Sequence, residues 1–295
     1  MSLGAILSWS PLVVTILATL EGLVLTFIAK RAYNWKSYLS ALTDFMVREH
    51  IVYPYLAIGL ARPLIGFAWQ HRLTTIPLDG LTSFAVVFLG QEFCYYWFHR
   101  AAHRMRWFWS NHAVHHASNE FNWGISYRFG WAGRLIGDSL FYVPLIWIGF
   151  SPQAVFLTLT LNLLYQFWIH NEWTPKLGWF EYVFNMPSHH RVHHASNTEY
   201  LDRNYGGVLI VFDRLFGTYA EERADNPCRY GLTTPLLTYN PVKIAFHEFI
   251  KVGRDLTGAR SIRDVLGYLF GPPGWKPRRV EDVVNAEPEG LSLGG

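Results

Sequence analysis

Cysteine and charged side chains are both scarce in this 295-residue chain. Its two cysteines, Cys94 and Cys228, cannot build a cysteine metal site or a framework of several disulfide bonds. Charged residues make up 16% of the chain, below the quarter that is typical of soluble domains, whereas hydrophobic residues make up 51%. The net charge of +3 is too small to indicate nucleic-acid binding. The composition therefore favours a membrane protein and argues against a nucleic-acid partner.

The sequence also lacks the common motifs that bind nucleotides, dinucleotides or haem. The sequence has no glycine-rich dinucleotide fingerprint after a strand, no phosphate-binding P-loop and no haem-attachment motif. If these residues carry out redox chemistry, we therefore expect the electrons to come from a separate reductase, an electron-carrier protein or a diffusible reductant.

Long apolar runs, by contrast, are present. Residues 5–29 form a run long enough to cross about 30 Å of hydrocarbon, a weaker run covers residues 50–70, and further runs cover residues 78–98, 134–150 and 152–170. Lys30, Arg31 and Lys36 follow the first run and mark that end as cytoplasmic. The runs predict an all-α, multi-pass membrane helical bundle of about four or five spans, in the bacterial inner membrane or the endoplasmic reticulum. Residues 1–271 are expected to form a single domain and residues 272–295 a flexible tail.

An eight-residue histidine segment occurs twice. HAVHHASN (112–119) returns as HRVHHASN (190–197) with one mismatch, and Ser110 and Ser188 stand at matching places as predicted helix N-caps. On a helix, histidines at i, i+3 and i+4 lie within about 100° of arc, so all three are expected to point at one spot. Neutral imidazole is a common ligand of transition metals, and two copies predict a pair of metal ions.

Further histidines lie near the ends of the apolar runs. His99 and His103 follow the run 78–98 at i, i+4 spacing, His170 ends the run 152–170, and His189 precedes the second copy. We expect all of them in a cytoplasmic helical cap, at about five imidazoles per metal. The candidate metal ligands are His99, His103, His112, His115, His116, His170, His189, His190, His193 and His194.

Polar side chains near the histidines are candidates for a supporting role. Glu92 lies two helical turns before His99, Gln166 lies one turn before His170, and Asp202 follows the second copy. Neutral imidazoles leave the metal charge uncompensated, so we expect the carboxylates to accept hydrogen bonds from the imidazole N–H groups, and the Gln166 amide to join the His170 site directly or through water. In a stretch rich in Arg and Trp, Arg128 and Arg134 are candidates to meet a lipid phosphate headgroup.

At these residues the chain resembles the fatty acid hydroxylase / sterol desaturase superfamily of membrane di-iron oxidoreductases. The resemblance covers about residues 84–219 and rests on YYWFHRAAH (95–103), HAVHH (112–116) and SHHRVHH (188–194). With NYGG (204–207) and FDRLFGT (212–218), the chain is most similar to the alkylglycerol monooxygenase-like branch. The resemblance implies that the eight box histidines and His170 are iron ligands.

The resemblance also implies a function. The expected enzyme is an O2-dependent di-iron monooxygenase that hydroxylates an alkyl or acyl chain of a membrane lipid. It would need two Fe ions, O2 as co-substrate and an external electron donor, for which the branch makes a reduced pterin possible. Zn is expected to replace Fe in some recombinant protein, because Zn binds such ligands more tightly than Fe(II).

Other functions remain compatible with the same residues. A lipid or sterol desaturase would use the same metals, and product mass would separate it from a hydroxylase. A zinc-dependent membrane hydrolase would need only three protein ligands per ion and a carboxylate base, and would not need O2. A metal-binding membrane transporter would place its ligands near the middle of the membrane and would show metal flux.

Overall fold

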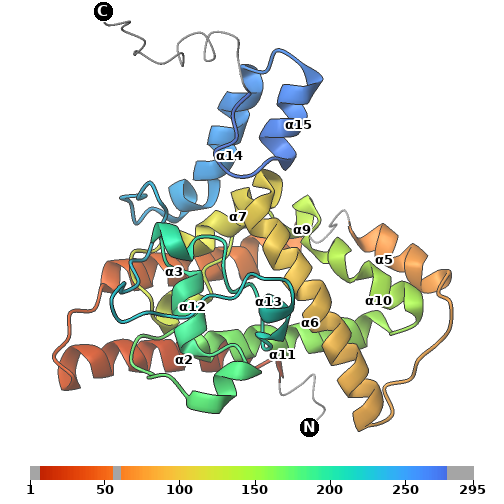
Figure 1. Cartoon of the computed structure of the whole chain (residues 1–295), viewed down its shortest axis with the longest axis horizontal. Helices are drawn as coiled ribbons and strands as arrows, with labels where there is room; N and C mark the ends of the chain where they lie inside the picture. Colours follow the sequence, from red (N-terminus) through yellow and green to blue (C-terminus); the bar gives the residue numbers. More distant parts are fainter. Residues whose placement is uncertain (1–6, 56–60, 278–295) are drawn as a thin grey trace, which may run out of the picture.

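The computed structural model describes residues 7–55 and 61–277 of the chain. Within these residues the regular structure is helical, and the β pairings are isolated bridges such as that between Phe184 and Leu209. The all-α prediction is therefore confirmed for the part of the chain that is described. The helices do not share one direction: α2 and α11 lie across the molecule in Figure 1, whereas α14 stands steeply above them.

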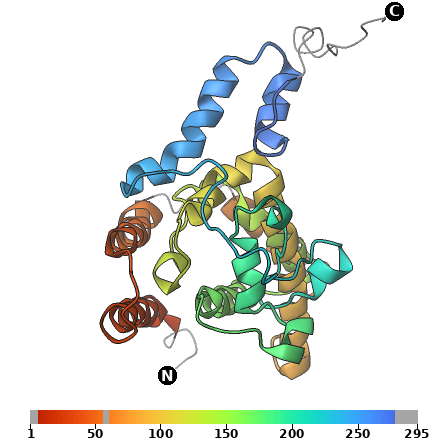
Figure 2. The same cartoon turned by 60° about the vertical axis from the view of Figure 1, so that its left-hand side comes forward.

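The N-terminal helices lie side by side on one flank of the molecule (Figure 2). Helix α2 (Ser10–Leu23) continues as the π-helical turn η1 (Val24–Ile28), and α3 (Trp35–Val47) continues as η2 (Arg48–Val52) and the short α4 (Tyr53–Tyr55). Asn34 caps the start of helix α3, where its Oδ1 accepts the Ser37 N–H at 3.1 Å. Ala18 of α2 and Ala41 of α3 share one buried cluster, which joins the two helices.

The centre of the fold is α6 (Leu81–Arg104), which packs against both α7 (Arg106–His116) and α11 (Pro152–Ile169). Helices α5 (Ala61–Gln70) and α10 (Val143–Ile148) lie against each other beside it. Val87 and Tyr95 of α6 share a buried cluster with Leu145 of α10 and Val155 of α11. These contacts fix the end of α6 that carries His99 and His103.

The remaining helices are shorter or lie toward the C-terminus. The short ones are α8 (Trp123–Ser126), α9 (Gly133–Ile136), η3 (Asp138–Tyr142), η4 (Gly178–Tyr182), α12 (Pro187–His193), η5 (Thr198–Tyr200) and α13 (Val211–Leu215). Helices α14 (Pro241–Thr257) and α15 (Ile262–Phe270) form a hairpin that stands out from the rest (Figure 1). Helix α14 packs on α7, so the hairpin stands next to the helix that carries the first histidine box.

Residues 272–277 do not form part of the expected flexible tail. The Trp275 ring lies 5.3 Å from the Tyr268 ring of α15, and Lys276 Nζ donates to Asp255 Oδ1 at 2.7 Å. Residues 272–277 therefore pack onto the hairpin. The Trp275 indole and the Lys276 ammonium have partners there that the composition of this segment did not suggest. The rest of the predicted tail, residues 278–295, lies outside the described residues.

One helix among the described residues is both long and apolar enough to cross a membrane, the 19-residue stretch Ser10–Ile28. The predicted run 134–150 is broken into α9, η3 and α10, because Gly137 takes a φ of 96° and ends α9. The run 50–70 is divided between η2, α4 and α5, and residues 56–60 lie outside the described part. The multi-pass topology therefore stays a prediction.

The predicted serine N-caps are wrong. Helix α7 begins at Arg106, directly after the break at Met105, and Ser110 lies inside it with Oγ donating to the Arg106 carbonyl at 2.8 Å. Helix α12 begins at Pro187, so Ser188 also lies inside a helix. Both helices start earlier than the serines, and α12 begins with a proline, which suits a first helical position.

Candidate metal centre

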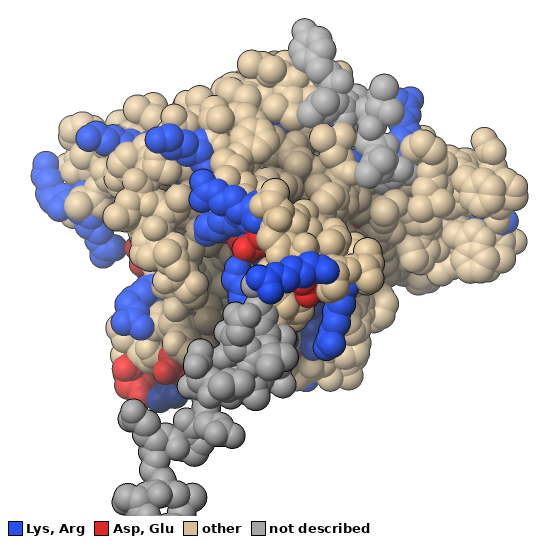
Figure 3. Space-filling view, turned by 90° about the horizontal axis from the view of Figure 1, so that it is seen from above, with Lys and Arg blue, Asp and Glu red and all other residues tan. Residues whose placement is uncertain are grey.

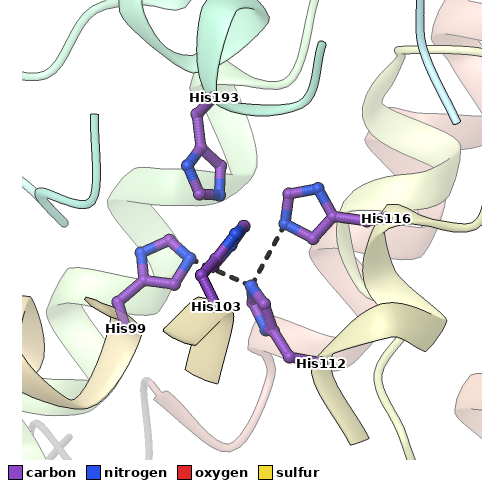
Figure 4. Close-up of side chains that lie close together, drawn as sticks. All are labelled: His99, His103, His112, His116 and His193. Carbon is purple, nitrogen blue, oxygen red and sulfur yellow. Dashed lines mark hydrogen bonds between the residues drawn. The ribbon is translucent and has the colours of Figure 1, made fainter. Parts of the chain in front are cut away.

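Nine of the ten predicted ligands gather into two buried groups. Within each group the ligand nitrogens lie within 4.8 Å of one another. The first group, on α6, α7 and α12, converges on one point in Figure 4 and consists of His99, His103, His112, His116 and His193. The second group consists of His115, His170, His190 and His194.

Each histidine box serves both groups. His112 and His116 belong to the first group and His115 to the second, while in the second box His193 belongs to the first group and His190 and His194 to the second. The expectation that all three histidines of a box point at one spot is wrong. At about 100° per residue, i and i+4 differ by only about 40°, whereas i+3 and i+4 differ by about 100°.

The crossed arrangement places the two groups next to each other. The ring of His116 in the first group stacks on the ring of His194 in the second, with centroids 4.3 Å apart. The rings of His115 and His116 lie 5.5 Å apart although they belong to different groups. Two ions held by these groups would therefore be neighbours in one buried centre.

The spacing of the nitrogens suits metal ions. His99 Nε2 lies 3.0 Å from His112 Nε2 in the first group, and His190 Nε2 lies 3.0 Å from His170 Nε2 in the second. Two ligands at right angles around an ion, with metal–nitrogen bonds of about 2.0–2.1 Å, would lie about 3 Å apart. The residues present therefore fit one imidazole-bound ion per group.

Backbone carbonyls orient several of the rings. In each case an Nδ1–H donates to a carbonyl oxygen and leaves Nε2 facing the group, which is the common arrangement for a metal-binding histidine. The pairs are His99 with Tyr205 at 2.8 Å, His115 with Arg128 at 3.1 Å, His170 with Gln166 at 2.6 Å and His193 with Arg203 at 3.0 Å. Nε2 of His103, His193 and His194 is buried and has no hydrogen-bond partner among the described residues.

Burial also keeps the imidazoles neutral. It lowers the pKa of His193 to about 4. The pKa of His115 falls well below its usual value, first because of burial and then because of the neighbouring His170. Neutral imidazole is the form that binds metals, so the cluster is ready for cations without first losing protons.

Glu92 supports the centre from a distance. It is 1% exposed, and its Oε2 accepts the N–H groups of Val208 and Leu209 at 2.8 and 2.9 Å. These residues follow Tyr205, whose carbonyl orients His99. The predicted supporting role of Glu92 is therefore indirect: it fixes the loop that holds a ligand.

Gln166 continues this support toward the second group. Its backbone carbonyl accepts from His170, and its side-chain amide donates to Asn162 Oδ1 at 2.6 Å and accepts from the Tyr95 hydroxyl at 2.9 Å. Asn162 in turn donates to Glu92 Oε1. A single hydrogen-bonded chain thus links the helices that carry ligands of both groups.

Asp202 is the described carboxylate nearest to a clustered imidazole. Its Oδ1 lies 3.7 Å from His103 Nδ1, and Arg104 donates to its Oδ2 at 2.6 Å. At 3.7 Å no hydrogen bond joins the two groups, so Asp202 acts on the site through its charge, and D202N is expected to lower the metal affinity of the first group by a few-fold, at most about 10-fold. Competition with a chelator measures this. D225N, in an exposed ion pair with Arg223, is the matched control, and equal affinity in both variants would contradict the assignment.

Three predicted site residues lie elsewhere or act differently. His189 belongs to neither group; its Nδ1 accepts the Met186 N–H at 3.2 Å and so caps the start of α12. Arg128 is 3% exposed and donates through Nε to the Val114 carbonyl at 3.0 Å, so the predicted contact with a headgroup is wrong for this residue. Its long side chain turns inward to a carbonyl. Arg134 is exposed and lies over the Tyr53 ring at 3.9 Å.

Sequence reasoning missed the backbone groups and the packing around the rings. Every residue type has a backbone carbonyl, so the sequence does not mark those of Tyr205, Arg203 and Arg128. The Phe121 ring lies 5.4 Å from His170 and 5.1 Å from His194, but nothing in the sequence distinguishes it from an ordinary core aromatic residue. The one usable signal was the glycine pair after Tyr205: a Cβ at Gly207 would lie 2.0 Å from Asn162 Nδ2.

Comparisons with known proteins match the same region. A family model described as fatty acid hydroxylase matches residues 84–218. The chain is 37% identical over 219 residues to a human alkylglycerol monooxygenase (Homo sapiens), covering 72% of the chain and 47% of that protein. The Danio rerio alkylglycerol monooxygenase is 37% identical over 251 residues, covering 84% of the chain and 53% of that protein.

A bacterial relative is named for a different class of lipid. An ornithine lipid hydroxylase of Rhizobium tropici is 31% identical over 148 residues, covering 48% of the chain and 43% of that protein. The chain spans about half the length of the curated relatives it matches. No solved structure matches the chain. Through residues 84–218, which contain all nine clustered histidines, the chain belongs to the fatty acid hydroxylase family.

Proposed function

We propose that this chain is a membrane-bound, O2-dependent monooxygenase that hydroxylates an alkyl or acyl chain of a lipid. The observation that carries the proposal is the pair of adjacent, buried histidine groups inside the matched family region. The names of the relatives, alkylglycerol monooxygenase and ornithine lipid hydroxylase, combine a lipid with insertion of oxygen. Because those lipids differ, the relatives support the class of substrate rather than one lipid.

Two Fe ions are the proposed metals. Five and four imidazoles leave at least one open position on each octahedral ion for O2 or water. When bound, the irons would supply the O2 activation needed to attack an unactivated C–H bond. The chain's own residues hold the imidazoles neutral, fix their orientation through backbone carbonyls and exclude bulk water by burying all nine rings.

The exposed apolar surface supports a place in the membrane. Leu12, Ile16, Leu20 and Phe27 along Ser10–Ile28 are all exposed, as is Leu81 at the start of α6. Such surface is expected where lipid rather than water covers a helix. The face seen from above in Figure 3, toward the α14–α15 hairpin, shows many more Lys and Arg than Asp and Glu side chains. We infer that this basic face is cytoplasmic.

The proposed metal centre needs an electron donor and must be weighed against alternative reactions. Electrons would come from a separate reductase, an electron-carrier protein or a reduced pterin, since the sequence has no motif for a bound electron carrier. A desaturase would share the metals and the first hydrogen abstraction. A zinc hydrolase needs only three protein ligands per ion, so groups of five and four histidines favour the oxygenase.

The test uses membranes from cells that express the chain, supplied with isotope-labelled O2. The expected result is a lipid that gains one labelled oxygen atom, detected by mass spectrometry of the lipid extract. Loss of two hydrogens without label would instead identify a desaturase. Turnover that continues without O2, or labelled lipid in equal amount from cells lacking the chain, would refute the proposal.

A further inference from the structure

The α14–α15 hairpin carries two rows of exposed apolar side chains. On α14 the row consists of Val242, Phe246 and Ile250, and on α15 it consists of Ile262, Leu266 and Phe270; all six side chains are 41–74% exposed. Each row has i, i+4, i+8 spacing, so its members lie within about 80° of arc on one side of their helix. Apolar side chains that gather in this way, rather than standing singly, mark a surface that contacts a partner or a membrane.

Other residues attach the hairpin to the fold. Ile244 of α14 is buried in a cluster with Val114 of α7, and the buried Tyr268 ring of α15 lies 5.3 Å from the Trp275 ring. Phe246 is the row residue with a ring contact to the rest of the described chain, with Trp131 at 5.7 Å, and it is still exposed. The hairpin is therefore held in place mainly by side chains outside the two rows. It also lies outside residues 84–218, which the family model matches.

The charge of the hairpin has one sign at its surface. Residues 241–277 contain six Lys and Arg but three Asp and Glu, and the three carboxylates are buried or half-buried. Two of the carboxylates are paired: Glu248 with Lys251 at 2.9 Å and Asp255 with Lys276 at 2.7 Å. The exposed charged side chains of this segment are all cationic: Lys243, Lys251, Arg254, Arg260, Arg263 and Lys276.

Three of these cations stand beside the apolar rows. Arg254 continues the α14 row at i+4 after Ile250, and Arg260 and Arg263 stand at the start of α15. An apolar helix face edged by Lys or Arg is typical of a helix that lies on an anionic lipid surface. The charges of the hairpin therefore complement the phosphates of such lipids.

The direction of the hairpin suits a place along a membrane surface. Helix α14 stands steeply in both views, whereas α2 lies across Figure 1 and is seen nearly end-on in Figure 2. Helix α2 belongs to Ser10–Ile28, the stretch that is long and apolar enough to cross a membrane. If that stretch spans the bilayer, a helix that runs crosswise to it follows the bilayer surface. The hairpin also rises from the basic face that we infer to be cytoplasmic (Figure 3).

We propose that the hairpin lies on the cytoplasmic leaflet, with both apolar rows at the boundary between headgroups and acyl chains, and with Arg254, Arg260 and Arg263 against the phosphates of anionic phospholipids. The proposal rests on the membrane location given above but not on the oxidation reaction. An arginine can keep its guanidinium at the phosphates while its alkyl stem covers apolar surface. A second copy of the chain is disfavoured as the occupant, because it would bring the same cations together.

Fluorescent labels on the full chain in lipid nanodiscs test this placement. An environment-sensitive dye is attached to I250C or L266C, in a C228S background that leaves the buried Cys94 as the native cysteine. The discs contain phosphatidylcholine mixed with phosphatidylglycerol and a nitroxide-labelled phospholipid. We expect the nitroxide to quench both dyes at least about twofold more than a dye at D225C, an exposed position after α13.

Two results would overturn the placement. One is quenching at I250C and L266C that is no stronger than at D225C, because the rows would then face water. The other is a dye that is shielded from water but not quenched by the labelled lipid, because a protein surface would then cover the row. Labels on both helices are needed, since one flat surface meets both rows only if they share a face of the hairpin.

The combined variant R254Q/R260Q/R263Q tests the contact with anionic lipid. It is expected to lose about half of the quenching at I250C in the mixed discs and to match the level found in phosphatidylcholine alone. K176Q/R223Q, which removes two exposed cations outside the hairpin, is the control and should keep the full quenching. Equal quenching of the I250C dye with and without phosphatidylglycerol, or no change in the arginine variant, would contradict the role given to the arginines.

The placement of the hairpin and the oxidation of a lipid can fail separately, because the dye measurement needs neither O2 nor turnover. Lipid contact at both rows without any isotope-labelled lipid product would leave the placement and refute the oxygenase. Isotope-labelled product from a chain whose dyes stay in water would leave the oxygenase and refute the placement.

Discussion

Replacing His193 by alanine is expected to lower the rate of lipid oxidation more than about 100-fold, beyond the effect of losing a residue that only orients a ligand. His193 is the one residue of the second box in the first group. Its ring centroid lies 4.4 Å from that of His99 and 4.8 Å from those of His103 and His116. The substitution removes the one ligand that α12 contributes to the first group. The measurement is labelled product per unit of membrane-bound protein.

His115→Ala is the matching test of the second group and is expected to abolish oxidation as well. If the two ions act as one centre, losing a ligand from either group has the same consequence. Both variants should remain in the membrane fraction. H71A, which changes an exposed histidine stacked on Phe67, is the control and should keep full activity. Full activity in H115A or H193A would refute a shared centre.

The variant E92Q is expected to destabilise the protein by about 1–3 kcal/mol although it keeps the size of the side chain. All three partners of Glu92 are donors: the Val208 and Leu209 N–H groups and the Asn162 amide. A glutamine brings an NH2 group that must face one of them. Asn162 cannot simply turn over, because its Oδ1 already accepts from Gln166.

Thermal unfolding of the protein in detergent measures this effect. The midpoint for E92Q should fall clearly below that of the wild type. Metal loading should weaken as well, because Glu92 holds Val208 and Leu209, which follow Tyr205, and the Tyr205 carbonyl orients His99. E199Q, an exposed glutamate whose Oε2 accepts from Asn226 at 3.3 Å, should change stability by less than about 0.5 kcal/mol. Unfolding of E92Q at the wild-type midpoint would contradict the role given to the carboxylate.

The sequence was enough to predict which histidines matter but not how they divide. Spacing fixes the angle between His112, His115 and His116 on one helix. Which ring joins which group depends on where α6, α11 and α12 present their own histidines, and that is a property of packing. His189 shows the same limit, because its ring is used to cap α12 rather than to join a group.

Composition was a poorer guide to the helices and the surface. An apolar run such as 134–150 suggested one span, yet Gly137 takes a φ value of 96° and breaks it. Arg128 stood among tryptophans as an interfacial residue would, but it reaches inward to the Val114 carbonyl. Long side chains such as arginine serve either environment, and only the fold decides between them.

Metal analysis of the purified chain gives the most direct test of the paired centre, with the wild type, H115A and H193A prepared in the same way. The proposal predicts about two bound transition-metal ions per wild-type chain, and a clear loss of metal in each variant, because each removes a ligand from a different group. A wild type that binds less than about one ion per chain, or variants that keep the full metal content, would contradict it.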